Sequence, residues 1–166
     1  MPAVHSVIDT PIGELTIVAV DGALTGAYFP AHKRMPDAEA FGPRVDTGFI
    51  EAKRQLSEYF AGERTEFDLP LSPKGDVFQQ KVWNLLRRIP YGQTRSYGQL
   101  ARELGDLHLA QAVGNANGRN PISIIVPCHR VVGADGRLVG YAGGLERKRF
   151  LLELEEPVET KAAKLF

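Results

Sequence analysis

The sequence predicts an α+β protein, with a small antiparallel sheet in the N-terminal part and a mostly helical C-terminal part. Three apolar stretches, at 3–8, 15–20 and 24–29, have the length and residue types of strands. Asp21-Gly22, between the last two, is a strong signal for a hairpin turn. In the second half, the apolar residues repeat at helical spacing instead. A chain of 166 residues is long enough to bury one ordinary core or two small ones.

One helix is predicted to follow the strands, after a loop at 30–48 that is rich in proline, glycine and charge. Its apolar positions repeat three and four residues apart: Phe49, Ala52, Leu56 and Phe60. Gly62 is placed to end this helix, because glycine readily adopts the left-handed conformation that closes many helices. The stretch 68–75, which contains two prolines, has the composition of a linker.

The C-terminal part is predicted to contain a helix-turn-helix. A helix over 78–89 comes first and stops at a Pro-Tyr-Gly sequence. Ser96 and Gln99 then fit a capping box, which begins a short helix that runs to Leu104. A second short helix follows at about 109–117, and two short helices joined by a tight turn are typical of a helix-turn-helix. A last helix is predicted over 145–155.

Cys128 could be a small buried apolar residue or a nucleophile, and its neighbours favour the second interpretation. The preceding segment, 122–126, is too short and too rich in β-branched residues for a good helix, so we expect a buried extended segment there. Pro127 restricts the approach to the cysteine, His129 follows it and Arg130 adds positive charge. Basic or cationic neighbours favour the reactive thiolate, and a histidine base usually needs a carboxylate to orient it. The residues alone leave both interpretations open.

Composition and charge restrict the function classes. The net charge is zero, but residues 1–75 carry seven basic and eleven acidic side chains, whereas 76–155 carry eleven basic and seven acidic. A polyanion would therefore meet the second half, although such imbalances are common in small domains. No apolar run approaches the roughly 20 residues that span a bilayer, and the first residues lack a secretory-signal pattern. One cysteine allows no internal disulfide and no cysteine-based zinc cluster, so we expect a cytoplasmic protein.

Residues 120–133, with the sequence NPISIIVPCHRVVG, closely resemble the active-site signature of the O6-alkylguanine-DNA alkyltransferase family. The similarity extends upstream to residue 78 and downstream through 140–144 to Leu152, so it covers nearly all of residues 76–155. Looser similarity occurs at 10–15 and 59–62. The resemblance implies a ribonuclease-H-like N-terminal domain and a winged-helix-like C-terminal domain with the helix-turn-helix.

The resemblance implies a role for each catalytic residue. Cys128 matches the alkyl acceptor, and His129 matches the base that polarises it through a water molecule. Glu155 is at the position of the carboxylate that orients this histidine. Asn120 matches the hinge asparagine that ties the helix-turn-helix to the active-site segment. Tyr97 matches the tyrosine that contacts N3 of the guanine.

The resemblance also implies which residues receive the substrate. Tyr141, Ala142 and Gly143 would wall the alkyl pocket, and the backbone carbonyl of Val131 would help to read the guanine amino group. The DNA-binding residues that it implies are Ser96, Tyr97, Gln111, Ala112, Gly114, Arg119 and Arg130. Short side chains would let the second helix approach the minor groove closely, at Ala110, Ala112, Gly114 and Ala116.

The function that the resemblance implies is direct-reversal DNA repair in a single, irreversible turnover. The O6-alkylguanine would be flipped out of the duplex and would lose its alkyl group to the Cys128 thiolate, while Tyr97 offers a proton toward N3. O4-alkylthymine is a second candidate substrate. The expected partner is double-stranded DNA that contains O6-alkylguanine, with no membrane, no metal and no organic cofactor. We expect a monomer without an obligate protein partner, and cooperative assembly on DNA stays open.

Two positions depart from the family pattern. Gln111 stands where the family usually has an arginine that replaces the flipped nucleotide in the base stack, and Ala142 replaces a common serine. Glutamine lacks the stacking and phosphate attraction of the cation, so we expect weaker or slower base flipping. The N-terminal zinc site of some relatives cannot form in the same way, because the chain has no cysteine to supply it.

We predict three parts: an α+β structural domain at 1–70, a DNA-binding and alkyl-acceptor domain at 76–156, and a tail at 157–166. Two rival functions stay open. A non-catalytic binder of DNA lesions is disfavoured by Cys128, because the relatives of that kind replace the acceptor cysteine. A cysteine hydrolase that uses Cys128 and His129 would show turnover without DNA, and the helix suited to a DNA groove argues against it.

Overall fold

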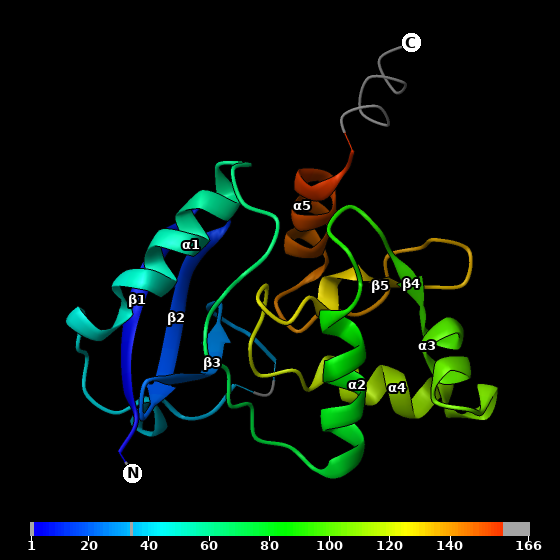
Figure 1. Ribbon diagram of the computed structural model, residues 1–166, viewed down its shortest axis with the longest axis horizontal. Helices are drawn as coiled ribbons and strands as arrows, with labels where there is room; N and C mark the ends of the chain where they lie inside the picture. The colour runs from blue at the N-terminus through cyan, green and yellow to red at the C-terminus, as the bar shows by residue number, and fades with distance from the viewer. Residues whose placement is uncertain (1, 34, 158–166) are drawn as a thin grey trace.

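The three N-terminal strands form an antiparallel sheet in chain order, β1 (Val4–Thr10), β2 (Gly13–Val20) and β3 (Ala23–Tyr28). They belong to a computed structural model that describes residues 2–33 and 35–157 (Figure 1). The turn between β2 and β3 has φ of 53° at Asp21 and 80° at Gly22, the conformation that Asp-Gly favours in two-residue hairpins. The predicted strands and their hairpin are confirmed.

One face of the sheet packs against α1 (Ile50–Phe60). Leu15, Ile17 and Leu56 are fully buried in this layer. The other face carries a smaller cluster, in which the rings of Tyr28 and Phe41 stack with their centroids 5.7 Å apart. Gly62 has φ of 78° just after α1, which confirms the predicted end of the helix.

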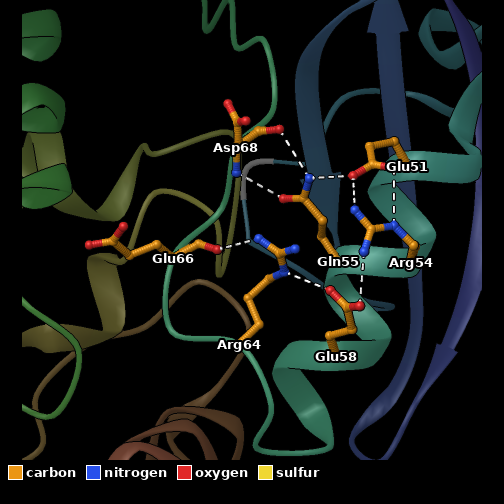
Figure 2. Close-up of polar contacts among 7 residues, drawn as sticks. All are labelled: Glu51, Arg54, Gln55, Glu58, Arg64, Glu66 and Asp68. Atoms are coloured by element: carbon orange, nitrogen blue, oxygen red, sulfur yellow. Dashed lines mark hydrogen bonds and ion pairs between the residues drawn. The ribbon is translucent and has the colours of Figure 1, made fainter.

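Polar side chains of α1 hold the chain that leads away from this helix (Figure 2). The Gln55 amide donates to the Asp68 carbonyl oxygen at 3.0 Å and accepts from the Asp68 backbone N–H at 2.8 Å. Arg64 donates to the Glu66 carbonyl oxygen and to the Glu58 carboxylate, both at 2.9 Å. These contacts fix both the position of α1 and the path of the chain toward the second half.

The C-terminal part is mostly helical, with α2 (Val77–Arg87), α3 (Tyr97–Glu103), α4 (Ala110–Gly118) and α5 (Leu145–Glu155). The Ser96 hydroxyl accepts from the Gln99 N–H at 3.1 Å, and the Gln99 side chain accepts from the Ser96 N–H at 2.8 Å. This confirms the predicted capping box at the start of α3. The α3 and α4 helices contact each other, as the helix-turn-helix prediction requires.

Shorter elements connect the helices. The two-residue strands β4 (Arg95–Ser96) and β5 (Val131–Val132) pair in parallel. The described residues also include the 3-10 helices η1 (Ala38–Phe41), η2 (Thr47–Phe49), η3 (Leu107–Leu109) and η4 (Cys128–Arg130). The first two lie in or next to the loop predicted at 30–48, and the last contains the cysteine.

The segment 122–126 is buried, as predicted, but it is a turn and not an extended segment. Its middle residue, Ile124, has φ of 74°, which is strained for a β-branched residue and therefore not foreseen by residue preferences. Neighbouring backbone holds the start of the turn. Ala27 of β3 donates to the Pro121 carbonyl oxygen at 2.8 Å and accepts from the Ser123 N–H at 3.2 Å. The sheet edge thus fixes the segment that leads to the cysteine.

The larger hydrophobic cluster runs through both halves of the chain. It joins Phe29 and Leu56 of the N-terminal part to Trp83, Leu100 and Leu151 of the C-terminal part. In Figure 1, α5 stands between the sheet with α1 and the other helices. No helix within the two described ranges is long and apolar enough to cross a membrane. Apart from its first residue, the tail predicted at 157–166 lies outside the described residues.

Candidate active site

Cys128 is the first residue of η4, directly after the strained turn. Its side chain is buried, and the residue as a whole is 4% exposed. Burial raises the pKa of Cys128 above its ordinary value, although a hydrogen bond from Asn120 and the positive charge of Lys148 act in the opposite direction. A thiol with a raised pKa is a weak nucleophile by itself, so reaction at this sulfur requires a nearby base.

His129 is a suitable base because it is buried and neutral. Its Nε2 lies 2.7 Å from Oε2 of Glu155, the last residue of α5. Burial lowers the pKa of His129, and the attraction of Glu155 opposes this shift only in part. Because an ionised carboxylate only accepts hydrogen bonds, the proton of the neutral ring is on Nε2. That tautomer leaves Nδ1 as an acceptor, and Nδ1 has no hydrogen-bond partner among the described residues.

Arg130 forms a two-point ion pair with the same carboxylate. Its Nε lies 2.7 Å from Glu155 Oε1 and its Nη2 lies 3.0 Å from Oε2, while Nη1 donates to the Ile89 carbonyl oxygen at 2.6 Å. The residue is only 6% exposed. The prediction that Arg130 binds DNA is therefore wrong, because its guanidinium already holds a buried carboxylate and cannot reach a phosphate without breaking that pair.

Glu155 is the centre of this buried cluster. Burial alone would raise its pKa, but the charges and hydrogen bonds of His129 and Arg130 outweigh burial and lower the pKa to about 2. The carboxylate also accepts a hydrogen bond from the hydroxyl of Tyr59, which comes from α1 in the N-terminal part. Glu155 therefore stays ionised in the neutral range and orients the His129 ring.

Two asparagines fix the backbone around the cysteine. The Asn120 amide donates to the carbonyl oxygens of Val126, at 2.8 Å, and of Ile122, at 3.3 Å. Asn117, in the last turn of α4, donates to the Cys128 carbonyl oxygen at 3.4 Å. Together they connect the end of the helix-turn-helix to the cysteine segment, which is the place where the resemblance put a hinge asparagine.

A cavity of about 170 Å³ opens beside this cluster. Its lining comes from the N-terminal loop, α3, α4 and the loop before α5: Lys33, Tyr97, Gly114, Asn117, Gly118, Gly140, Tyr141 and Ala142. The Tyr97 hydroxyl donates to the Val139 carbonyl oxygen at 2.9 Å, and burial raises the pKa of Tyr97, so the hydroxyl keeps its hydrogen and acts as a hydrogen-bond donor. The structure thus brings the predicted residues Tyr97, Tyr141 and Ala142 to one cavity.

The loop before α5 is held by a buried lysine. Lys148 is fully buried, and its Nζ donates to the carbonyl oxygens of Val131, at 2.6 Å, Val139, at 2.9 Å, and Gly140, at 3.0 Å. Burial lowers the pKa of Lys148 to about 8. The predicted substrate-reading carbonyl of Val131 is therefore fixed by a cation that the sequence pattern did not single out.

Gly143 needs to be glycine because its neighbours lie too close for a side chain. A Cβ at this position would lie 2.9 Å from the Tyr141 ring and 3.3 Å from Phe29. The same loop is tied to the N-terminal part by Arg147, whose side chain donates to the carbonyl oxygens of Gly143 and Ile12 at 2.9 and 2.8 Å. The N-terminal part therefore helps to shape the cavity wall.

The predicted DNA-binding residues differ in exposure. Gln111 on α4 and Arg119 just after its end are exposed, whereas Ala112, Gly114 and the capping residue Ser96 are half-buried. Ala110 is also half-buried, at the start of the helix. Ala116 is 2% exposed, and its carbonyl oxygen accepts from the Trp83 indole at 2.8 Å. The expectation that Ala116 faces a DNA groove is therefore wrong, because this residue packs against α2.

Sequence reasoning missed three residues of the site: Tyr59, Asn117 and Lys148. No spacing pattern connects Tyr59 with a carboxylate 96 positions later. Lys148 is one of three consecutive basic residues, which usually indicate a solvated helix face. The only available signal for Tyr59 was that it lies in the loosely matching stretch 59–62.

Buried polar atoms without a partner gather around Cys128. Within residues 2–33 and 35–157, the buried side-chain atoms that lack a hydrogen-bond partner are Asn117 Oδ1, Ser123 Oγ, His129 Nδ1 and Tyr141 Oη. Such atoms are costly in a folded protein unless a ligand or water satisfies them. A water molecule or a polar ligand beside Cys128 would satisfy such atoms.

Two family models match the chain and together span most of its length. The model described as the ribonuclease-like domain of 6-O-methylguanine DNA methyltransferase matches residues 3–73. The model of the DNA-binding domain of the same family matches residues 77–157.

Curated relatives are similar over nearly their whole length. A methylated-DNA–protein-cysteine methyltransferase of Mycobacterium tuberculosis is 51% identical over 159 residues, which cover 92% of each chain. One of Methanosarcina acetivorans is 46% identical over 151 residues, which cover 91% of this chain and 97% of the relative.

Solved structures show the same fold. The crystal structure of the Mycobacterium tuberculosis O6-methylguanine methyltransferase has a TM-score of 0.85 and 47% identity, and the match covers 96% of this chain and 98% of the other. The crystal structure of Mycobacterium tuberculosis OGT in complex with DNA has a TM-score of 0.85 and 50% identity over 92% of each chain. This chain therefore belongs to the 6-O-methylguanine DNA methyltransferase family, the one that its cysteine segment resembles, and it is a DNA-repair methyltransferase that acts on DNA.

Proposed function

We propose that the chain transfers the alkyl group of O6-alkylguanine in duplex DNA to Cys128, once per protein molecule. The observation that carries the proposal is the buried series Cys128, His129 and Glu155, in which the acceptor nitrogen His129 Nδ1 has no partner among the described residues. A methylated-DNA–protein-cysteine methyltransferase at 51% identity supports the same reaction.

In the proposed reaction, His129 Nδ1 takes the thiol proton through a water molecule, and Glu155 stabilises the imidazolium that forms. The sulfur attacks the alkyl carbon, a carbon–sulfur bond forms, and the bond between that carbon and O6 breaks. The electron pair of this bond goes to the guanine, which Tyr97 helps to neutralise by offering a proton toward N3. The proton that His129 took from the thiol then replaces the one given by Tyr97, so both side chains end in their starting state. The balance is one thiol proton transferred to guanine and one alkyl group transferred to sulfur. A thioether has no route to hydrolysis, so each molecule reacts once.

We propose that α3 and α4 bind the minor groove and that the damaged nucleotide is flipped into the cavity beside Cys128. Gln111 on α4 and Arg119 just after it are exposed, and small residues such as Ala112 leave room for the backbone of DNA. The relative whose structure contains DNA supports this assignment. Residues 76–156 would carry DNA binding and chemistry, and residues 1–70 would support them.

The first experiment is intact mass measurement and peptide mapping after the protein is mixed with excess duplex that contains O6-methylguanine. We expect one methyl group, on Cys128, and a yield that stops at one per protein. The Cys128→Ser variant should remain unmodified. A parent protein that binds the lesion tightly but gains no methyl group would contradict the proposal and point to damage recognition alone. A duplex with O4-methylthymine tests the second substrate in the same way.

The Gln111→Arg variant tests the effect of the departure from the family pattern. We expect it to bind the duplex about tenfold more tightly or to react faster, because arginine adds stacking and phosphate attraction. DNA binding and single-turnover rates of parent and variant, at one salt concentration, measure this. No gain in either quantity would show that Gln111 does not limit base flipping.

A further inference from the structure

The N-terminal part places one side chain in the catalytic cluster. Tyr59, in the last turn of α1, donates its hydroxyl hydrogen to Oε2 of Glu155 across 96 positions of sequence. The residue is 0% exposed. No pattern in the sequence predicted an N-terminal residue beside the reacting groups.

The position of Tyr59 is fixed on several sides. Its ring packs edge-on against Phe60 at 5.3 Å and Tyr91 at 6.2 Å, and it lies tilted against Phe67 at 5.3 Å between centroids. The helix that carries it is held by the polar contacts of Gln55 and Arg64 described above (Figure 2). The hydroxyl is therefore presented to Glu155 at a fixed place rather than by a mobile side chain.

Tyr59 and His129 share one oxygen atom. Glu155 Oε2 accepts from His129 Nε2, at 2.7 Å, from Arg130 Nη2, at 3.0 Å, and from the Tyr59 hydroxyl. Oε1 accepts from Arg130 Nε, at 2.7 Å. Each hydrogen bond to a carboxylate stabilises its charged form and weakens its pull on any other proton. The Tyr59 hydroxyl therefore reduces the negative charge that Oε2 directs at the histidine.

Tyr59 acts only as a donor. Burial and the charge of Glu155 raise its pKa far above the neutral range, so the hydroxyl keeps its proton at every pH at which the fold is stable. The charged groups that act on His129 are Glu155 and Lys148 of α5 and Arg130 of η4. Those that act on Glu155 are His129 and Arg130. Tyr59 acts on the same carboxylate as a neutral hydrogen-bond donor, and the charge of Glu155 also raises the pKa of Tyr91.

We propose that Tyr59 is a positioning residue for alkyl transfer: its hydroxyl shares Glu155 Oε2 with His129 and thereby limits the basicity of the His129 ring. The proposal rests on the proposed function in that it takes His129 as the base. The N-terminal part then has a role besides structural support. Tyr59 of α1 adjusts the basicity of His129 through Glu155, while the C-terminal part supplies the reacting atoms.

The test compares Tyr59→Phe with Tyr91→Phe. Tyr91 is a matched control, because its hydroxyl donates to the Leu154 backbone carbonyl at 3.2 Å and not to the carboxylate. NMR of protein with labelled histidines follows the titration of the His129 ring. We expect the Tyr59→Phe change to raise the pKa of His129 by about one pH unit and the Tyr91→Phe change to leave it within a fraction of that shift. 3-Fluorotyrosine at position 59 is a stronger hydrogen-bond donor than tyrosine, so it should lower the pKa of His129 instead. This substitution keeps the test possible if the Tyr59→Phe variant does not fold.

A second measurement links the shift to the reaction. In single-turnover assays at saturating duplex with O6-methylguanine, the acidic limb of the pH–rate profile should move upward with the His129 titration in Tyr59→Phe. An unmoved His129 titration, or an equal shift in Tyr91→Phe, would overturn the role of Tyr59. A parent protein that gains no alkyl group would instead overturn the proposed function, and the NMR titration would still decide the role of Tyr59.

Discussion

Two clusters of arginine and carboxylate, one on α1 and one in the candidate active site, have similar chemistry and opposite surroundings. On α1, Arg54 bonds to Glu51 and Glu58 with its side chain half exposed to water (Figure 2). In the candidate active site, Arg130 bonds to Glu155 with side-chain exposures of 8% and 2%. Water screens the first cluster, so it contributes little to stability. In the second cluster, breaking the ion pair would leave a buried charge without a counter-charge. Arg130 and Glu155 therefore keep their positions, and Glu155 holds the His129 ring in one orientation.

One carboxylate from each cluster, Glu51 and Glu155, has a similar pKa despite the different surroundings. The pKa of Glu51 and that of Glu155 are both lowered to about 2. For Glu51 the main cause is the hydrogen bond from Arg54 at an exposed position. For Glu155, burial pushes the other way and is outweighed by the charges and hydrogen bonds of His129 and Arg130. The same value therefore reflects a weak local contact in one place and a strong, desolvated network in the other.

The largest expected effect comes from Glu155→Gln, which leaves the Arg130 guanidinium buried without a counter-charge. We expect the free energy of unfolding to fall by about 3–5 kcal/mol, measured by urea denaturation. Alkyl transfer should slow by about 100-fold or more, because His129 loses the group that orients it. Glu153→Gln, an exposed change on the same helix, is the control. Equal losses of stability and activity in Glu155→Gln and Glu153→Gln would show that burial of the ion pair does not determine its importance.

Acid should destabilise the protein in two stages. His129 and His32 have lowered pKa values in the folded state, so the unfolded chain binds their protons first and stability falls as the pH drops below about 6.5. Glu155, with its folded pKa of about 2 against 4.5 for a free side chain, contributes its full stabilisation above about pH 4.5. About 3 kcal/mol of it is lost as the pH falls from there toward 2. Unfolding measured between pH 7 and 2 should show a smaller second stage in Glu155→Gln, and an unchanged one would refute the assignment.

The Lys148→Met variant tests the role of a buried cation. Lys148 is held by three carbonyl oxygens and, among the described residues, by no carboxylate. Methionine has a similar shape but leaves these oxygens without their donor. We expect a loss of about 2 kcal/mol in unfolding free energy. Hydrogen exchange at residues 139–141 should also become faster. A variant with unchanged stability and exchange would mean that the loop before α5 is held by its other contacts, such as those of Arg147.

The smallest effect is expected for Arg54→Ala. Both of its ion pairs are exposed to water, so the midpoint of urea denaturation at physiological salt should stay within measurement error of the parent value. Alkyl transfer should also be unchanged. A loss as large as that of Glu155→Gln would show that exposure does not separate the two clusters.

Local signals in the sequence were sufficient for most of the fold. Asp21-Gly22 specified the hairpin, the Ser96 capping box specified the start of α3, and helical spacing located α1 and α5. The turn at 122–126 was not predictable in this way. Its conformation depends on pairing with Ala27 of β3, which lies almost a hundred positions earlier in the chain, and this pairing overrides the β preference of Ile124.

The site was predictable to the extent that its residues are neighbours in sequence or match a known segment. Cys128, His129, Asn120 and the distant Glu155 could be named, but the partner of Arg130 could not be derived from its position beside a cysteine. The resemblance implied a contact of Arg130 with DNA, whereas the folded chain buries its guanidinium against Glu155. Tyr59 and Lys148 were missed for the same reason, because only packing brings them to the site.

The bond between Tyr59 and Glu155 also has a consequence for the order of events during synthesis. Glu155 is the last residue of α5, so its carboxylate emerges from the ribosome after β3, Cys128 and His129. Until then His129 lacks the carboxylate that orients it, although β3 and Asn120 can already hold the turn before Cys128. Domains generally fold as units during translation, N-terminal segments first, and contacts between distant positions form late. In a nascent chain, Cys128 would therefore be present before His129 can activate it, and the site would become reactive only when α5 folds.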